Sequence, residues 1–374
     1  MNKCCIRIVS LLLALALTVG LVPVRSHAFA EEDIPYPGDP LYVSEDEAAL
    51  ALRSQMQTRQ ETAIVYVHSY DNDYEQLYYR IMDKACAHDG TPTGGDYLLW
   101  HRIQYGGAPV YGYQTDTGNW FVFIYPVVYY DTAEQQTEMD EAIDSLLEEL
   151  ALDGKSDYEK VLGVYDYMTR NITYDYDNLN DETYHLKHSA YAALIHKTAV
   201  CQGYATLFYR LMLELGVDCR FISGIGITPS NENGDAHGWN IVKLDGKYYN
   251  VDATWDAEAV RVGLPYQYFL RADETFEDHY RDAQYDSEEF RARYPMAQTD
   301  YVPEEHPQVL PGDVNGNGTV DGNDATVLLQ YAAGWDVEIK DAAADVNADG
   351  TIDGHDATLL LQYAAGWDVE LKAA

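Results

Sequence analysis

Apolar side chains recur every three to four residues in some stretches of the chain and every second residue in others, and these two periods predict helices and strands. Helices are expected over residues 45–60, 74–86, 132–152, 157–170, 186–196 and 202–215. Strands are expected over residues 63–67, 217–227, 237–244 and 246–252, and over 108–130 as a pair around an Asp-Thr-Gly-Asn turn. The pattern therefore predicts an α+β fold.

The first thirty residues follow a different pattern. Lys3 and Arg7 precede an apolar run from Ile8 to Val22, and small residues follow up to Ala30. This order is typical of a secretory signal peptide, and the run is shorter than the ~20 residues that cross a bilayer. We expect a secreted, extracellular protein with no membrane span.

Composition divides the rest of the chain. Residues 31–155 form an N-terminal α+β region whose independence is open, and residues 156–295 form a denser domain that carries the candidate chemistry. Prolines interrupt residues 296–311, which read as a linker. Residues 312–374 form a third domain, because 312–340 and 344–372 share 22 identities in 29 positions.

Charge narrows the class of partner. Without Lys3, Arg7 and Arg25 of the signal, the chain keeps 21 basic against 62 acidic side chains, a net charge near −41. Such a surface repels phosphate backbones and anionic membranes. We therefore exclude nucleic acid as a partner.

Three cysteines remain after the predicted cleavage: Cys86, Cys201 and Cys219. An odd number in a secreted chain indicates either intermolecular pairing or a free thiol with a function. A bridge between Cys86 and Cys219 would leave Cys201 free, but the sequence does not establish that pairing.

Cys201 stands at the start of a predicted helix, where the helix dipole favours the nucleophilic thiolate. His237 begins a strand, and the next strand leads into Asp252 after an Asp245-Gly246 turn. A hairpin at that turn would bring His237 close to Asp252, which could orient the imidazole. Backbone N–H groups at the helix start could stabilise an oxyanion.

The segments around these residues resemble the transglutaminase-like superfamily. Its bacterial members show a G-x-C-x-G-Y-A helix, an H-x-W-N strand and a V-D-x-T-W-D strand in this order, and here Ala199 replaces the first glycine. The resemblance covers about residues 155–260. It implies a papain-like core, in which a cysteine-bearing helix packs against an antiparallel sheet.

The resemblance also implies roles for individual residues. Cys201 would be the nucleophile, His237 the general base and acid, and Asp252 the group that orients the histidine. Trp239 and Trp255 would shape the cleft, and Gln202 would face the substrate. No cofactor is expected for catalysis.

The repeated tail contains two twelve-residue loops, 313–324 and 345–356, with EF-hand spacing of oxygen donors and glycine at position six. The spacing predicts two Ca²⁺ sites, with the carbonyl groups of Thr319 and Thr351 among the ligands. The side-chain ligands are expected to be Asp313, Asn315, Asn317, Asp321, Asp324, Asp345, Asn347, Asp349, Asp353 and Asp356. The last ligand is Asp and not Glu, and no entering helix is expected before either loop.

With these departures, the repeated tail resembles type I dockerin modules. These modules are small, all-α and calcium-binding, and they bind cohesin modules of scaffold proteins. The resemblance implies a cohesin partner, chiefly in polysaccharide-degrading complexes of the cellulosome type. Cohesin contact would fall at loop positions ten and eleven, which are Gly322, Asn323, Gly354 and His355.

The sequence leaves four functions open. The favoured one is a cysteine peptidase or amidase that acts on protein or peptide, and the second is an acyl transferase that crosslinks proteins through the same acyl-enzyme. The third is a non-catalytic adaptor with a papain-like fold. The fourth, glycoside hydrolysis, is disfavoured because no pair of catalytic carboxylates stands out. The many tyrosines could form a sugar-binding surface, but we interpret them as half-buried packing residues.

Overall fold

The computed structural model describes residues 44–68, 73–103, 110–115, 118–229, 231–303 and 310–372. The predicted signal peptide lies outside the described residues. The chain divides into two compact units, one ending at Tyr301 and the other beginning at Val302. None of the helices in the described ranges is long and apolar enough to cross a membrane.

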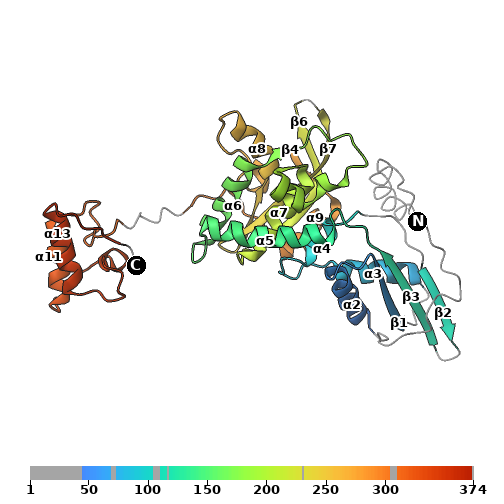
Figure 1. The fold of residues 1–374 in the computed structure, drawn as a ribbon, viewed down its shortest axis with the longest axis horizontal. Helices are drawn as coiled ribbons and strands as arrows, with labels where there is room; N and C mark the ends of the chain where they lie inside the picture. Colours follow the sequence, from blue (N-terminus) through green and yellow to red (C-terminus); the bar gives the residue numbers. More distant parts are fainter. Residues whose placement is uncertain are drawn as a thin grey trace. The chain divides into compact units, whose positions relative to one another are not determined.

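The first unit begins with a small three-stranded sheet covered by two helices (Figure 1). Strands β1 (Thr62–His68), β3 (Gly118–Pro126) and β2 (Val110–Thr115) lie in the order β1-β3-β2, and both pairs are antiparallel. Helices α2 (Glu45–Gln57) and α3 (Tyr74–Ala85) place Leu52 and Leu77 in the same core as Val65 and Phe123. These helices and strands share one core because their apolar residues face each other.

Three further helices contribute to the larger core of the unit. They are α4 (Gly95–Trp100), α5 (Ala133–Leu150) and α6 (Asp157–Asn171). Tyr97, Ile143 and Tyr165 all belong to the larger core. Helices α5 and α6 each begin with a capping box, at Thr132 and Ser156, which satisfies N–H groups of the first turn.

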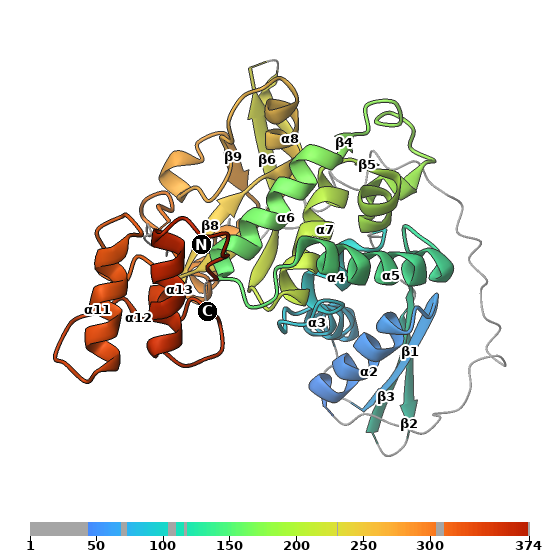
Figure 2. The same cartoon turned by 60° about the vertical axis from the view of Figure 1, so that its left-hand side comes forward.

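Helix α7 (Cys201–Glu214) lies at the centre of the larger core and packs against the second sheet (Figures 1 and 2). Its apolar side chains, including Leu207, Phe208 and Leu211, are fully buried. The sheet has the order β8-β7-β6-β9 and is antiparallel throughout. Its strands are β6 (Cys219–Thr228), β7 (Asn231–Leu244), β8 (Lys247–Val251) and β9 (His279–Arg281).

Short elements surround this helix and sheet. Before α7 lie β4 (Thr173–Tyr174), η2 (His185–His188), η3 (Ala192–His196) and β5 (Thr198–Ala199). After β8 lie α8 (Ala253–Arg261), η4 (Asp273–Thr275), α9 (Ala283–Asp286) and α10 (Glu288–Arg293).

The second unit is helical. Helices α11 (Gly322–Ala332) and α13 (Gly354–Ala364) lie side by side, and Leu328 and Leu360 meet in their shared core (Figures 1 and 2). A single helical turn, α12 (Asp341–Ala344), directly precedes the second loop. The expectation of no entering helix before either loop is therefore wrong for the second loop.

The mixed architecture confirms the predicted α+β class, and an antiparallel sheet packs against the cysteine-bearing helix as expected. One expectation is corrected. The helix expected over 186–196 is a 3₁₀ turn and a π turn, because the backbone becomes extended at Ser189, whose hydroxyl accepts a hydrogen bond from the N–H of Ala192 at 3.0 Å. The sequence left open whether Cys86 pairs with Cys219, and in the structure both are buried free thiols.

Candidate active site

Cys201 is the first residue of α7 and is half-buried. The preceding residue, Val200, has an extended backbone and no side-chain cap. The helix N-terminus beside the sulfur therefore stabilises negative charge. Tyr174 lies nearby on β4, and burial followed by the charges of Cys201 and Tyr176 raises the pKa of its hydroxyl.

His237 and Asp252 meet across the hairpin of β7 and β8. The turn residue Asp245 has a φ of 50° and Gly246 a φ of 79°, and the ladder pairs Asn240 with Val251. Asp252 directly follows Val251, and its Oδ2 lies 2.7 Å from Nε2 of His237. The hairpin thus brings together the two residues that the sequence proposed as neighbours.

The electrostatics of this pair favour a charged imidazole. Burial by itself would lower the pKa of His237, but the Asp252 carboxylate, its hydrogen bond and the interaction with the Cys201 thiol raise it to about 10. Burial would raise the pKa of Asp252, yet the two histidines beside it hold that pKa below its usual range. The site can therefore keep an imidazolium next to the cysteine near neutral pH.

Asp252 also begins the next helix. Its Oδ1 accepts hydrogen bonds from the backbone N–H groups of Thr254 at 2.9 Å and Trp255 at 3.3 Å, so it is the N-cap of α8. Its side chain is 1% exposed. This cap fixes the carboxylate that faces His237.

His279 is a member of this cluster that sequence reasoning missed. Its Nε2 lies 3.2 Å from Oδ2 of Asp252, and its Nδ1 lies 2.8 Å from Oδ1 of Asp278. The residue stands on the three-residue strand β9, which carries no recognisable motif. Only its arrival at the edge of the sheet beside β6 reveals it.

Two tryptophans that the sequence assigned to the cleft line the histidine. The ring of Trp255 stacks on His237 with centroids 5.0 Å apart, and the ring of Trp239 stacks at 6.1 Å. Gly226 on β6 leaves room for Trp255 and His237, because a Cβ there would come within 2.8 Å of Trp255 and 3.3 Å of His237. These aromatic faces hold the imidazole in place.

Gln202, which was expected to face the substrate, reaches toward the N-terminal part of the unit. Its Nε2 donates a hydrogen bond of 2.7 Å to the carbonyl of Trp100, the last residue of α4. The side chain of Gln202 also interacts with the half-buried His188. Residues before Ala133 therefore help to fix the residue next to the cysteine.

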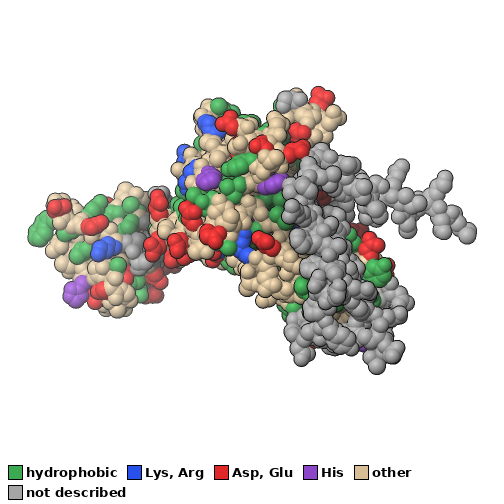
Figure 3. Space-filling model, turned by 45° about the vertical axis from the view of Figure 1, so that its right-hand side comes forward, with side chains coloured by type: hydrophobic (Ala, Val, Ile, Leu, Met, Phe, Trp, Pro, Cys, Tyr) green, Lys and Arg blue, Asp and Glu red, His purple; other side chains and the backbone are tan. Residues whose placement is uncertain are grey.

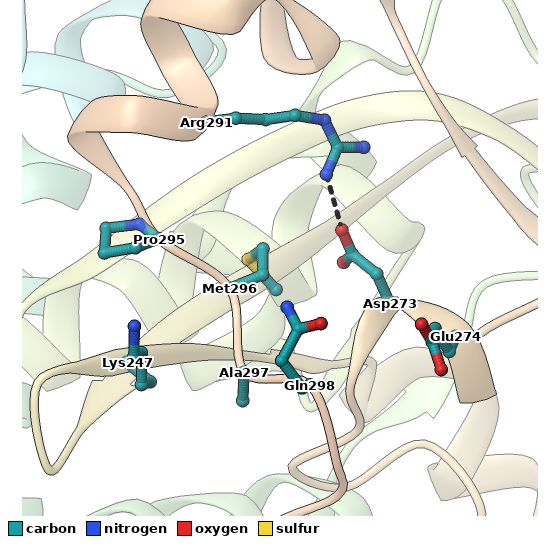
Figure 4. A pocket seen from close by; sticks show the side chains of 8 residues that line it. All are labelled: Lys247, Asp273, Glu274, Arg291, Pro295, Met296, Ala297 and Gln298. Atoms are coloured by element: carbon teal, nitrogen blue, oxygen red, sulfur yellow. Dashed lines mark hydrogen bonds and ion pairs between the residues drawn. The ribbon is translucent and has the colours of Figure 1, made fainter.

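Two hollows on the described part of the surface lie near the sheet, and Cys201 does not line either of them. One, of about 560 Å³, is lined by Lys247, Glu274, Met296 and their neighbours, and the ion pair between Arg291 and Asp273 lies at its side (Figure 4). A second, of about 210 Å³, is lined by Trp239, Phe276, His279, Arg281 and others, including the same ion pair. The second hollow therefore reaches the cluster from the side of β9.

His237, Asp252 and His279 have side chains of the kinds that hold metals, with candidate ligand atoms within 4.8 Å of one another. Both Nε2 atoms, however, lie at hydrogen-bond distance from one carboxylate oxygen. We therefore assign the three residues to a hydrogen-bonded cluster and not to a metal centre.

The two loops of the second unit have matching geometry. Asp324 and Asp356, at position twelve, are fully buried, and each accepts two backbone N–H bonds from within its own loop. Gly318 and Gly350, at position six, both have a φ of 83°. Carboxylate, amide and carbonyl oxygens around such a turn form a donor set that suits Ca²⁺.

The predicted cohesin-contact residues open the two helices of that unit. Gly322 and Asn323 are the first residues of α11, and Gly354 and His355 are the first residues of α13. The side chain of His355 is 86% exposed. The two repeats thus present different side chains, Asn and His, at equivalent places.

Comparisons with known proteins agree with both halves of this description. Residues 144–253 match the family model of the transglutaminase-like superfamily, and residues 311–363 match that of the type I dockerin domain. The chain is 27% identical over 166 residues to a curated relative called kyphoscoliosis peptidase, from both Mus musculus and Homo sapiens. The match covers 41% of this chain and 25% of each relative.

A solved structure described as a TGase is also similar to the chain. It shares 18% sequence identity with a TM-score of 0.29, and the match covers 54% of this chain and 57% of that one.

Proposed function

Because the chain carries a transglutaminase-like segment followed by a type I dockerin domain, we propose that it is a secreted cysteine hydrolase that cleaves amide bonds of protein or peptide while tethered to a scaffold. In this proposal Cys201 is the nucleophile, His237 the general acid and base, and Asp252 the orienting group. The observation that carries the proposal is the 2.7 Å contact between Nε2 of His237 and Asp252, together with the interaction of the same imidazole with Cys201.

The reaction would proceed in two steps. The thiolate of Cys201 attacks the amide carbonyl carbon, and backbone N–H groups at the start of α7 stabilise the oxyanion. The C–N bond then breaks, the His237 imidazolium gives its proton to the leaving amine, and a thioester remains. Neutral His237 next takes a proton from water, which attacks the thioester, and the C–S bond breaks to release the carboxylic acid.

The neighbouring residues support this chemistry by orientation. Stacking by Trp255 and Trp239 keeps the ring of His237 from turning, and the N-cap bonds hold Asp252. Gln202, held by the carbonyl of Trp100, stands beside the cysteine.

The second unit would serve as the tether. We propose that its two loops each hold one Ca²⁺ through the donor oxygens named above, and that the starts of α11 and α13 meet a cohesin module. The matching backbone geometry of the loops supports this assignment. Calcium would supply charge neutralisation for the clustered carboxylates and would take no part in catalysis.

The decisive experiment is mass spectrometry of the intact protein after treatment with iodoacetamide at graded pH. Cys201 should be alkylated rapidly at pH 6, where an ordinary thiol reacts slowly. Cys86 and Cys219 should react only on unfolding, because burial raises the pKa of both thiols. Cys201→Ala should abolish the fast reaction, and Cys86→Ala, the matched control, should retain it.

The same preparation separates the alternatives. Release of new amino groups from casein would support hydrolysis, whereas incorporation of a primary amine into casein would favour the acyl transferase. If Cys201 reacts no faster than an ordinary thiol, the hydrolase proposal fails and the adaptor becomes the better description.

A further inference from the structure

Both ring nitrogens of His279 face a carboxylate oxygen. Nε2 lies 3.2 Å from Oδ2 of Asp252, and Nδ1 lies 2.8 Å from Oδ1 of Asp278. A neutral imidazole has one N–H and one lone pair, so it can donate to only one of these oxygens. The imidazolium can donate to both.

The residues packed around His279 hold its ring between the two carboxylates. Its side chain is fully buried, and it stacks on Phe276 with centroids 3.9 Å apart. Trp255 and Trp239 close other sides at 4.3 and 5.0 Å. A buried charge in an aromatic cage requires a paired opposite charge, and here carboxylates lie at both ends of the ring.

Asp278 is itself fixed. Its Oδ2 accepts a hydrogen bond of 2.8 Å from the hydroxyl of Tyr268 while Oδ1 faces His279. The chain Tyr268–Asp278–His279–Asp252–His237 therefore joins two carboxylates and two imidazoles in alternation.

We propose that His279 is a positioning residue, an imidazolium held between Asp278 and Asp252 that fixes the Asp252 carboxylate and shares its negative charge with His237. The inference rests on the proposed function, because it concerns how Asp252 acts on the histidine of that site. One oxygen of Asp252 receives both imidazoles, and the other receives the N-cap bonds. A cation at His279 weakens the hold of Asp252 on the proton of His237, which brings that histidine closer to the proton affinity that proton transfer needs.

Other ionisable groups around His279 do not alter this assignment. Besides Asp252, Asp278 and His237, the Tyr268 hydroxyl approaches from the segment after α8, and Arg281 follows on β9. Arg281 is paired with Asp273 at 2.7 Å, so its charge is already neutralised.

The test uses the whole chain with ¹⁵N-labelled histidine and long-range ¹H–¹⁵N NMR over pH 6–11. In the parent protein at pH 8, two histidines, His237 and His279, should show both nitrogens protonated, and one of these two signals should be absent in His279→Gln. Asp278→Asn, which leaves the ring in place, should convert the same signal to a neutral imidazole.

The coupling to His237 is the readout that a purely structural role would not move. His279→Gln keeps a donor for Asp252 but removes the charge, so the titration midpoint of His237 should rise by about one pH unit. Asp278→Asn should move it in the same direction. His196→Gln, an exposed histidine on η3, is the matched control and should leave the midpoint unchanged.

The outcomes separate this inference from the proposed function. A neutral His279 at pH 8, or an unmoved midpoint of His237 in both variants, overturns the inference even if Cys201 is rapidly alkylated. Slow alkylation of Cys201 in a protein with a cationic His279 and a shifted midpoint overturns the hydrolase proposal and leaves the inference standing.

Discussion

Asp252 contacts His237 and also caps the N-terminus of α8, and one sequence motif accounts for both contacts. The run Val251 to Asp256 provides the carboxylate that faces His237 and, two and three residues later, the N–H groups that it caps. The sequence could therefore place Asp252, His237 and Cys201 in one site through three spaced motifs. It could not place His279, which lies 27 residues after Asp252 on a strand too short to show a period.

His188 is a half-buried titratable residue whose pH dependence can be predicted. Its pKa falls to about 4 because of burial first and then the charges of Lys187 and His185. A folded-state pKa below the unfolded value of ~6.5 means that stability is fully present above pH 6.5 and is lost as pH falls through 4. Relative to His188→Gln, the parent should lose at most about 3 kcal/mol of unfolding free energy between pH 7 and pH 4.

Urea titrations read by reaction of the buried Cys219 with 2,2′-dithiodipyridine, a disulfide that modifies thiols in acid, would measure this loss within the first unit. His196→Gln, an exposed histidine of η3, should follow the parent at every pH. Equal acid sensitivity of parent and His188→Gln would contradict the prediction.

At the scale of elements, α7 depends on a close approach to the segment before it. A Cβ at Gly203 would lie 2.7 Å from Cβ of Ala199 and 2.8 Å from the carbonyl oxygen of Ser189. Helix propensity alone would favour alanine by about 1 kcal/mol, so the packing opposes the propensity. Gly203→Ala should therefore destabilise the unit by about 1–3 kcal/mol and slow alkylation of Cys201.

The matched control lies two residues further along the same helix. Ala205→Gly should cost about 1 kcal/mol through backbone freedom while the reactivity of Cys201 stays near that of the parent. A Gly203→Ala protein as stable and reactive as the parent would contradict the prediction, because the backbone at Ser189 would then have moved to accommodate the methyl group.

Elements with long apolar periods were predictable, and those set by tertiary contacts were not. Helix α7 was expected over 202–215 and spans Cys201–Glu214, because its apolar positions repeat over four turns. The six-residue helix α4 was missed, since Tyr97 and Leu98 face two different cores and leave no periodic stripe. Sequence reasoning therefore left open how the N-terminal region relates to the site.

At the scale of the whole molecule, acidic side chains are spread over the surface and basic ones are few, as one face shows in Figure 3. The loops of the second unit concentrate this charge, so they should depend on Ca²⁺. Removal of calcium with EDTA should abolish helical circular dichroism from α11 and α13 and any binding to a type I cohesin. Alkylation of Cys201 should keep its rate, and a parallel loss of that reactivity would contradict the separation of roles.

One buried ion pair joins the N-terminal region to the second sheet. Asp96 on α4 accepts hydrogen bonds from Arg220 at 2.7 and 3.0 Å and from the N–H of Phe221 at 2.9 Å. Breaking a buried pair leaves a charge uncompensated, so Asp96→Asn should cost about 3 kcal/mol. Arg220→Met should cost a similar amount, and the double variant should cost less than the sum, as measured by urea unfolding.

The contact between Gln202 and the carbonyl of Trp100 bears on whether the N-terminal region could be removed by a maturation cut. Many secreted proteases are held inactive by a leading segment that is cut away. Here a cut that released α2 to α4 would strip Gln202 and Arg220 of the partners that α4 supplies. The N-terminal region therefore supports the residue beside Cys201 and the second sheet, and a cut that removed it would leave both without these contacts.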